Sequence, residues 1–210
     1  MSIVAVVREA AGQAQGTIVL LHGRGADEHD LLPLLGVLDP QQRFRGITLG
    51  APLSLPPGGK HWYAIRRIGH PDMATFNATY AELTSYLDEE LALDWSQTVI
   101  GGFSQGGVMS YAVGLGPGRP VPAGILAMSS FVPTLDDGSW EPDFATRPGL
   151  PVAHVHGVQD PVIGIELGRE AKRVLEAGGL PLTYAEFPGG HNVDPRLLPE
   201  LAGWVDARLT

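Results

Sequence analysis

Apolar residues along this chain form two kinds of run, short uninterrupted ones and longer ones with helical spacing. The short runs are apolar at nearly every position, which is typical of parallel strands that are covered on both faces. They predict strands at Gly46–Leu49, Thr98–Phe103, Ala123–Met128, Val152–Val155 and Leu182–Phe187.

Between these runs the apolar positions recur every three or four residues, as they do on one face of a helix. The longest such segment is Asp72–Leu93. Further helices are predicted at about Gln105–Leu115 and at Ile165–Ala177, which a Gly-Gly pair follows at the usual stop position. Asp194 and Pro195 suit the N-cap and the first turn of a final helix.

Two β-rich runs near the start of the chain, Ile3–Arg8 and Thr17–Leu21, are separated by Ala, Gly and Gln. This pattern predicts an N-terminal antiparallel hairpin beside a mostly parallel, doubly wound sheet. No linker divides the chain and no segment is long enough for a cap domain. Residues 1–210 are therefore expected to form one α/β domain, with an open site at the carboxyl ends of its strands.

Composition narrows the classes of function. The chain has 23 acidic and 14 basic residues and a formal net charge of −9, which argues against nucleic-acid binding and against a polybasic membrane contact. No apolar run approaches the ~18 residues of a membrane span, and the N-terminus is unlike a signal peptide. A cytoplasmic protein without stable membrane insertion is expected. The absence of cysteine excludes thiolate catalysis and cysteine-ligated zinc.

The stretch GGFSQGG, residues 101–107, contains the pattern Gly-x-Ser-x-Gly with Ser104 at its centre. A predicted strand ends before it and a predicted helix follows, as a nucleophile elbow requires. The serine of such an elbow lies in a strained turn, and the glycines two residues away on either side avoid clashes with neighbouring backbone. The alternative is a structural Gly-Ser turn.

A nucleophilic serine needs a histidine base and a carboxylate that orients the histidine. In enzymes with an elbow of this type, the acid follows the serine in the chain and the histidine follows the acid. His191 lies in a glycine-rich loop after the last predicted strand and is the predicted base. Asp160 directly follows the strand Val152–Val155 and is the predicted acid. The competing carboxylates lie in a long loop or at a helix cap; they are Asp136, Asp137, Asp143 and Asp194.

His154 and His156 also follow Ser104 in the chain, within or at the end of a strand. Their spacing would place two metal ligands on one face, but no third ligand is obvious, so neither a metal nor another cofactor is predicted. For His191 the alternative is a loop histidine that is hydrogen-bonded to the backbone. For Asp160 the alternative is an ordinary turn residue.

Acyl transfer also needs two N–H donors where the carbonyl oxygen becomes negative. The backbone N–H of Gln105 is expected to supply one, and that of Arg24, in the stretch HGRG after an apolar strand, the other. We interpret His22 as a structural hydrogen-bonding group. The Arg24 side chain is either a steering group for an acidic substrate or a solvated surface arginine.

Three aromatic residues are candidates for the substrate pocket. Trp62 and Tyr63 are adjacent in a segment rich in Pro and Gly, and Phe131 follows the strand Ala123–Met128. Aromatic side chains in loops line apolar pockets about as often as they anchor the loop to the core, so both roles stay open.

Four stretches, LLHGRGADEHDLLPL, GGFSQGGVMS, HGVQDPVI and PGGH, resemble the phospholipase/carboxylesterase family in their order and spacing. This family of small α/β-hydrolases includes acyl-protein thioesterases and bacterial carboxylesterases. The resemblance runs from about Thr17 to the C-terminus. It implies an α/β-hydrolase fold with Ser104 as nucleophile, Asp160 as acid and His191 as base, and with oxyanion donors at Arg24 and Gln105.

The resemblance further implies hydrolysis of carboxylic esters, thioesters or lysophospholipids without a cofactor, often by a homodimer, with Trp62 near the substrate groove. Thioesterase-type members commonly have leucine where this chain has Arg24. Two other classes of function stay open at this stage. One is a peptidase, lipase or lactonase that uses the same three residues, and the other is a non-catalytic binding module on the same fold.

Overall fold

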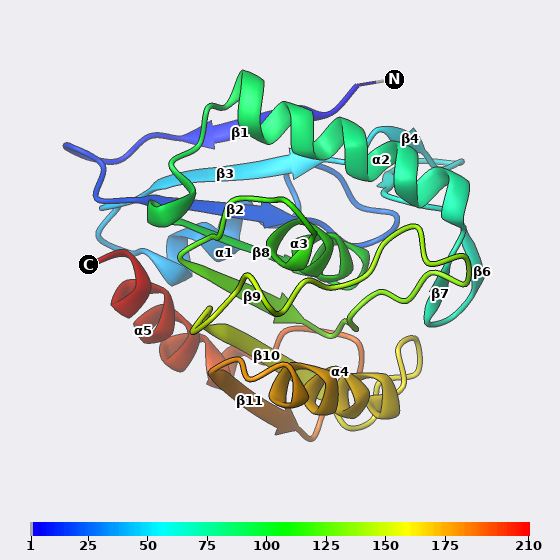
Figure 1. Ribbon diagram of the computed structural model, residues 1–210. Helices are drawn as coiled ribbons and strands as arrows, with labels where there is room; N and C mark the ends of the chain where they lie inside the picture. The colour runs from blue at the N-terminus through cyan, green and yellow to red at the C-terminus, as the bar shows by residue number, and fades with distance from the viewer. Residues whose placement is uncertain (1) are drawn as a thin grey trace.

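A seven-stranded sheet lies between two layers of helices in the computed structural model, which describes residues 2–210 (Figure 1). The strand order is β1-β3-β2-β8-β9-β10-β11, and all neighbours are parallel except β1 and β3. The strands of this sheet are β1 (Val4–Arg8), β2 (Thr17–Leu21), β3 (Arg45–Gly50), β8 (Thr98–Phe103), β9 (Gly124–Met128), β10 (Val152–Gly157) and β11 (Leu182–Phe187).

Three helices cover one face of the sheet and two cover the other (Figure 1). The first group is α2 (Met73–Ser85), α3 (Gln105–Leu115) and α4 (Ile165–Ala177), and the second is α1 (Leu32–Leu38) and α5 (Leu198–Leu209). Shorter elements are a π-helical segment η1 (Tyr86–Glu90), 3-10 turns η2 (Trp95–Gln97) and η3 (Pro195–Leu197), and two small hairpins, β4 (Leu53–Ser54) with β5 (Lys60–His61) and β6 (Ile65–Arg67) with β7 (His70–Pro71).

The mostly parallel, doubly wound architecture predicted from the sequence is confirmed, and the bounds of β8, β11, α3 and α4 are those expected. Asp72 caps α2 by accepting a hydrogen bond from the Thr75 N–H at 3.0 Å. The single helix expected at Asp72–Leu93 differs in its last part, because α2 ends at Ser85 and continues as the π-helical η1.

The predicted N-terminal hairpin is wrong. Strand β1 is antiparallel, but it pairs with β3, with Val6 opposite Thr48, while β2 lies on the other side of β3 and parallel to it. Burial explains the difference. Side chains of β2 such as Val19 are 0% exposed and suit a central strand, whereas Val7 of β1 is 38% exposed and suits the edge.

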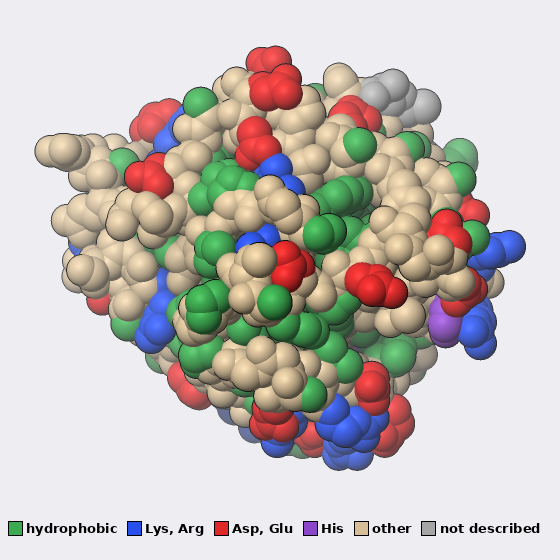
Figure 2. Space-filling view, in the orientation of Figure 1, with side chains coloured by type: hydrophobic (Ala, Val, Ile, Leu, Met, Phe, Trp, Pro, Cys, Tyr) green, Lys and Arg blue, Asp and Glu red, His purple; other side chains and the backbone are tan. Residues whose placement is uncertain are grey.

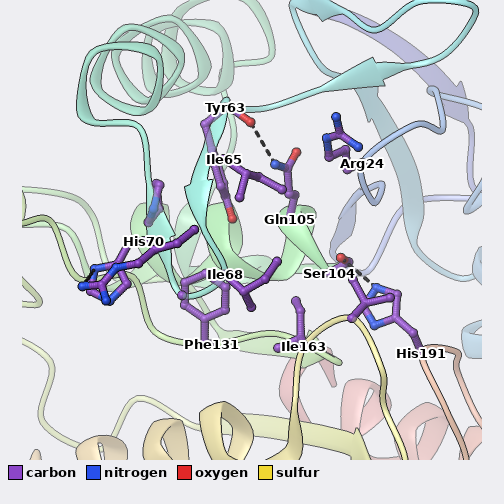
Figure 3. Close-up of a pocket in the computed structure, with 14 residues that line it drawn as sticks. Arg24, Tyr63, Ile65, Ile68, His70, Ser104, Gln105, Phe131, Ile163 and His191 are labelled. Carbon is purple, nitrogen blue, oxygen red and sulfur yellow. Dashed lines mark hydrogen bonds between the residues drawn. The ribbon is translucent and has the colours of Figure 1, made fainter.

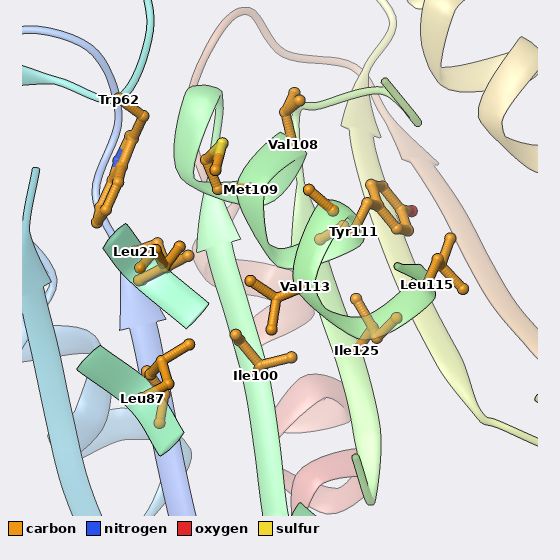
Figure 4. Packing of buried hydrophobic residues seen from close by; sticks show 14 of the residues in the cluster. Leu21, Trp62, Leu87, Ile100, Val108, Met109, Tyr111, Val113, Leu115 and Ile125 are labelled. Carbon is orange, nitrogen blue, oxygen red and sulfur yellow. The ribbon is translucent and has the colours of Figure 1, made fainter. Parts of the chain in front are cut away.

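Helix α3 is buried along its whole length and packs over the middle of the sheet. Val108, Met109 and Val113 on α3 contact the side of the sheet that carries Leu21 and Ile100 (Figure 4). Since α3 starts directly after Ser104, the turn that carries this serine is held by a helix whose residues are all buried in the core.

The strand order also creates a crevice. From β2 the chain continues to β3 on one side of the sheet centre, and β8 lies on the other side of β2. The loops that leave β2 and β8 therefore diverge at the carboxyl ends of two neighbouring strands, where ligands bind in open α/β sheets.

None of the helices within residues 2–210 has the length and apolar character needed to cross a bilayer.

Candidate active site

Ser104 lies in a strained turn between β8 and α3. Its φ is 55° and its ψ −122°, a conformation that costs a residue with a side chain on the order of 1–3 kcal/mol. A Cβ at Gly102 would collide with the backbone of Gly106, and a Cβ at Gly106 with the carbonyl group of Leu21. The two glycines of the motif are therefore required by the close packing of this turn against the end of β2.

Three side chains from separate loops form a continuous chain of hydrogen bonds at this turn. The Nε2 atom of His191 lies 2.9 Å from Oγ of Ser104, and its Nδ1 atom lies 2.7 Å from Oδ2 of Asp160. Because the carboxylate can only accept, Nδ1 carries the proton and Nε2 is left to accept from the serine hydroxyl. The arrangement matches the requirements of general-base activation of a serine.

The carboxylate of Asp160 is held in one orientation. Its Oδ1 atom accepts hydrogen bonds from the N–H groups of Val162 and Ile163, both at 2.8 Å, which leaves Oδ2 for His191. The Asp160 side chain is 0% exposed and that of His191 is 17% exposed. Water therefore reaches the imidazole but not the carboxylate behind it.

The loops that carry Asp160 and His191 are tied to each other. The N–H of Gln159 donates to the carbonyl of Gly189 at 2.9 Å, and a Cβ at Gly157 would collide with the carbonyl groups of Gly189 and Gly190. The Phe103 ring packs against the His191 ring, with a centroid distance of 4.7 Å. The glycines let the loop after β11 cross over the end of β10, which brings His191 above the sheet.

His154 and His156 form a buried hydrogen-bonded chain behind the site rather than a metal site. Nε2 of His156 lies 2.8 Å from the Ile163 carbonyl, which can only accept, so this nitrogen carries a proton. Its Nδ1 then accepts from Nε2 of His154 at 3.2 Å, and Nδ1 of His154 accepts from the Tyr111 hydroxyl at 2.7 Å. No group of three or more His, Cys, Asp or Glu side chains in the described residues has an arrangement suited to a metal.

Burial lowers the pKa of His154 to about 3 and also lowers the pKa of His156, so both rings are neutral in the folded protein. In the unfolded chain the two histidines have their ordinary pKa of 6.5, so they bind protons when the pH falls below this value. The free energy of unfolding is thus expected to fall as the pH drops from about 6.5 towards 3, by about 2 kcal/mol for His154 between pH 7 and pH 5.

Urea unfolding at pH 7 and pH 5 measures this loss. His154→Phe is expected to remove much of it, while the control His29→Gln, at an exposed position, retains it. Equal stability of the native protein at the two pH values would contradict the assignment of neutral buried rings.

Trp62 connects the loop that contains Arg24 to the start of α3. The Trp62 indole N–H donates to the His22 carbonyl at 2.8 Å, and the Trp62 backbone N–H donates to Oε1 of Gln105 at 3.1 Å. The Gln105 side chain also donates to the Tyr63 carbonyl at 2.9 Å. This network fixes the two residues predicted as oxyanion donors, Arg24 and Gln105, relative to each other.

Trp62 itself is buried in the core. It is 0% exposed, it packs on the His22 ring at a centroid distance of 5.4 Å, and it does not line the pocket at Ser104. The large apolar indole and its N–H both find partners inside the protein, so Trp62 anchors its loop to the core, which is one of the two roles that the sequence left open.

A pocket of about 360 Å³ opens beside Ser104 and His191 (Figure 3). Tyr63 and Phe131, for which the sequence left this role open, line it together with Arg24 and Gln105. The residues that the sequence analysis missed come from the β6–β7 hairpin and from the loop after Asp160; they are Ile65, Arg67, Ile68, Gly69, His70, Pro71, Val162 and Ile163. Strands of two or three residues leave no periodic pattern, and the one available signal was the pair Ile65 and Ile68 on either side of two arginines.

Fold and site together define an α/β-hydrolase, and comparisons with known proteins agree. The carboxylesterase of Bacillus cereus has a similar structure, with a TM-score of 0.82 at 22% identity, covering 98% of this chain and 94% of that chain. Esterase PE8 also gives a TM-score of 0.82 at 22% identity, covering 99% of each chain. Acyl-protein thioesterase 1 of Gibberella zeae is 26% identical over 229 residues, which cover 99% of this chain and 96% of the relative.

The family model described as Phospholipase/Carboxylesterase matches residues 3–208. The chain belongs to this phospholipase/carboxylesterase family. Membership of this family makes it an enzyme of the carboxylic-ester hydrolase class.

Proposed function

We propose that the protein cleaves carboxylic esters through a covalent acyl-enzyme on Ser104, with His191 as general base and Asp160 as the acid that orients it. The observation that carries this proposal is the continuous series of contacts from Asp160 through His191 to Ser104 at the wall of a pocket. Thioesters and lysophospholipids are further substrates of the same chemistry.

In the first step His191 takes the Ser104 proton at Nε2 while Oγ attacks the ester carbonyl carbon. The imidazolium then gives this proton to the leaving alcohol or thiol, and the acyl group stays on Oγ. Water repeats the sequence: His191 removes a proton from it, the resulting hydroxide attacks the acyl carbon, and the imidazolium returns the proton to Oγ as the bond between Oγ and the acyl carbon breaks. Asp160 stabilises the imidazolium in both halves without being protonated.

The backbone N–H groups of Arg24 and Gln105 are the proposed oxyanion donors. Gln105 is the first residue of α3, so its N–H has no carbonyl of a preceding helical turn to bind, and the helix N-terminus favours negative charge. The Gly23 carbonyl and the Arg24 N–H belong to one trans peptide and point in opposite directions. Nδ1 of His22 lies 2.6 Å from that carbonyl and thereby fixes where the Arg24 N–H points.

His22 is neutral with its proton on Nδ1, because Nε2 accepts from the Ala51 N–H at 3.0 Å and burial lowers the pKa of the ring. An asparagine side chain places an N–H close to the Nδ1 position, whereas a glutamine side chain reaches towards the Nε2 position. We therefore expect His22→Gln to lower kcat by about tenfold to a hundredfold at nearly constant KM, and His22→Asn to lower it much less.

Steady-state kinetics with thermal unfolding of both variants tests this role of His22. The two substitutions remove a similar amount of buried ring, so equal kcat values in variants of equal stability would show that His22 acts only in packing.

The proposed mechanism is tested by treating the native protein with a fluorophosphonate and locating the adduct by mass spectrometry. An adduct on Ser104 that blocks hydrolysis of short-chain esters is expected. A native protein that neither reacts with the probe nor hydrolyses esters, thioesters, lactones or peptides would favour the binding-module alternative. The panel also separates an esterase from a peptidase or lactonase. A homodimer and a cytoplasmic location stay predictions from the sequence.

A further inference from the structure

The pocket at Ser104 has a charge opposite to that of the protein. The chain carries 23 acidic and 14 basic residues, yet none of the 14 residues that line this pocket in the described chain is Asp or Glu. Two of them, Arg24 and Arg67, are arginines. In Figure 2 acidic side chains are spread over the face, and basic and histidine side chains lie, together with some acidic ones, at the edge where Figure 1 places β6 and β7; other basic side chains lie along the lower edge.

Neither arginine forms a direct ion pair with a carboxylate of the protein. Within residues 2–210 no carboxylate lies within 4.0 Å of the guanidinium of Arg24 or Arg67. Most other arginines of the chain do pair with a carboxylate; these are Arg8, Arg43, Arg45, Arg119, Arg169, Arg173 and Arg196. In an acidic protein, two unpaired arginines in one pocket indicate a negative partner that the protein itself does not supply.

Arg24 is close to the reacting serine. A Cβ at Gly23 would lie 3.4 Å from Cβ of Ser104, so the loop that carries Arg24 is in contact with the nucleophile turn. The N–H of Gly25 donates to the Lys60 carbonyl at 2.8 Å, which fixes the backbone after Arg24. The exposed Arg24 side chain thus starts from a fixed point and lies on the side of the pocket that faces Ser104 and Gln105 (Figure 3).

Arg67 reaches the pocket from the β6–β7 hairpin. Side chains alternate along a strand, and Ile65 and Arg67 of β6 line the pocket while Arg66 does not. Nδ1 of His70 lies 3.1 Å from the Asp136 carboxylate and 3.4 Å from Nη2 of Arg67. One nitrogen cannot donate to Asp136 and accept from Arg67 at once, and the shorter contact to the carboxylate prevails, which leaves the Arg67 guanidinium free for another partner.

We infer that this site takes esters or thioesters that carry an anionic oxygen group, a carboxylate or a phosphate, near the scissile carbonyl. Arg24 binds that group, with Arg67 as the second cation. A guanidinium binds carboxylate and phosphate oxygens through two parallel N–H donors, which adds orientation to attraction. The apolar wall formed by Ile65, Ile68 and Ile163 holds the hydrocarbon part of the substrate. The inference rests on the proposed function of the site.

The experiment compares kcat/KM for esters of equal length and different charge. The anionic substrate is the monoethyl ester of adipic acid, the neutral one is its primary amide, and the cationic one is the ethyl ester of an ω-amino acid of the same length. A fourth ester that ends in a phosphate separates phosphate from carboxylate as the preferred group. Hydrolysis is followed by titration of the released acid.

The native enzyme is expected to prefer the best anionic ester over the amide by about tenfold at low salt, and to lose most of this preference at 1 M salt, where charges are screened beyond ~3 Å. Arg24→Gln should reduce the ratio of anionic to neutral kcat/KM by about fivefold to tenfold, and Arg67→Gln by a smaller factor. Arg66→Gln, on the same strand but outside the pocket, is the matched control and should leave both the ratio and the activity unchanged.

A native enzyme that hydrolyses the amide at least as well as both anionic esters would overturn the inference. So would an undiminished ratio in the double variant Arg24→Gln, Arg67→Gln. Both results leave the serine mechanism intact as long as the neutral ester is hydrolysed and a fluorophosphonate labels Ser104. Failure of the proposed function is recognised separately, by hydrolysis that survives when Ser104 is replaced by alanine.

Discussion

Ser104→Ala is expected to lower kcat for ester hydrolysis by roughly four to six orders of magnitude. Without Oγ there is no atom to form the acyl-enzyme, and His191 is left to activate water on its own. The activity that remains comes from substrate binding and from the proposed oxyanion donors at Arg24 and Gln105. The fold should tolerate the change, because alanine removes one oxygen and leaves the strained turn and its two glycines in place.

Ser110→Ala provides the matched control. Ser110 lies two turns further along α3, is fully buried, and donates to the Gly106 carbonyl at 2.8 Å. Its removal should cost some stability but leave kcat within about twofold, because it contacts no reacting atom. Burst kinetics and intact-protein mass spectrometry with an activated ester measure acylation directly. Acylation of the Ser104→Ala protein at an undiminished rate would refute the assignment of the nucleophile.

Asp160→Asn is expected to lower kcat by about four orders of magnitude, because it moves the proton of the His191 ring from Nδ1 to Nε2. Oδ1 of Asp160 accepts from two backbone N–H groups, those of Val162 and Ile163. In the variant only the amide oxygen suits this place, so the amide N–H₂ faces Nδ1 of His191. That nitrogen must then accept, the proton moves to Nε2, and Nε2 is no longer able to take a proton from Ser104.

Asp137→Asn is the control for this substitution, since Asp137 is an exposed carboxylate that accepts from the Ser139 N–H at 3.0 Å, away from the pocket. Nitrogen NMR of the labelled ring should report a proton on Nδ1 of His191 in the native protein and on Nε2 in Asp160→Asn. An Asp160→Asn enzyme with native kcat, or with the proton still on Nδ1, would show that Asp160 does not orient the base.

Local patterns predicted much of this protein well. Strand β8 and helix α3 have the bounds expected from the sequence, because an apolar run and a helix with small residues at its start depend little on distant parts of the chain. The placement of Ser104, Asp160 and His191 at the ends of strands followed from the same patterns. One wrong prediction and one question that the sequence left open have the same cause. The partner of β1 and the burial of Trp62 depend on which surfaces remain to be covered after the sheet has assembled.

By itself, the sequence determined the parallel sheet, the strained serine turn and the three residue types that the chemistry requires, since these follow from hydrophobic spacing and from motifs within a few residues. Only the tertiary structure decided that β1 pairs with β3, that the short β6–β7 hairpin forms a pocket wall, and that Arg24 and Arg67 face this pocket without carboxylate partners. The physical reason is that pairing, burial and charge neutralisation depend on distances between residues far apart in the chain, which no local pattern records.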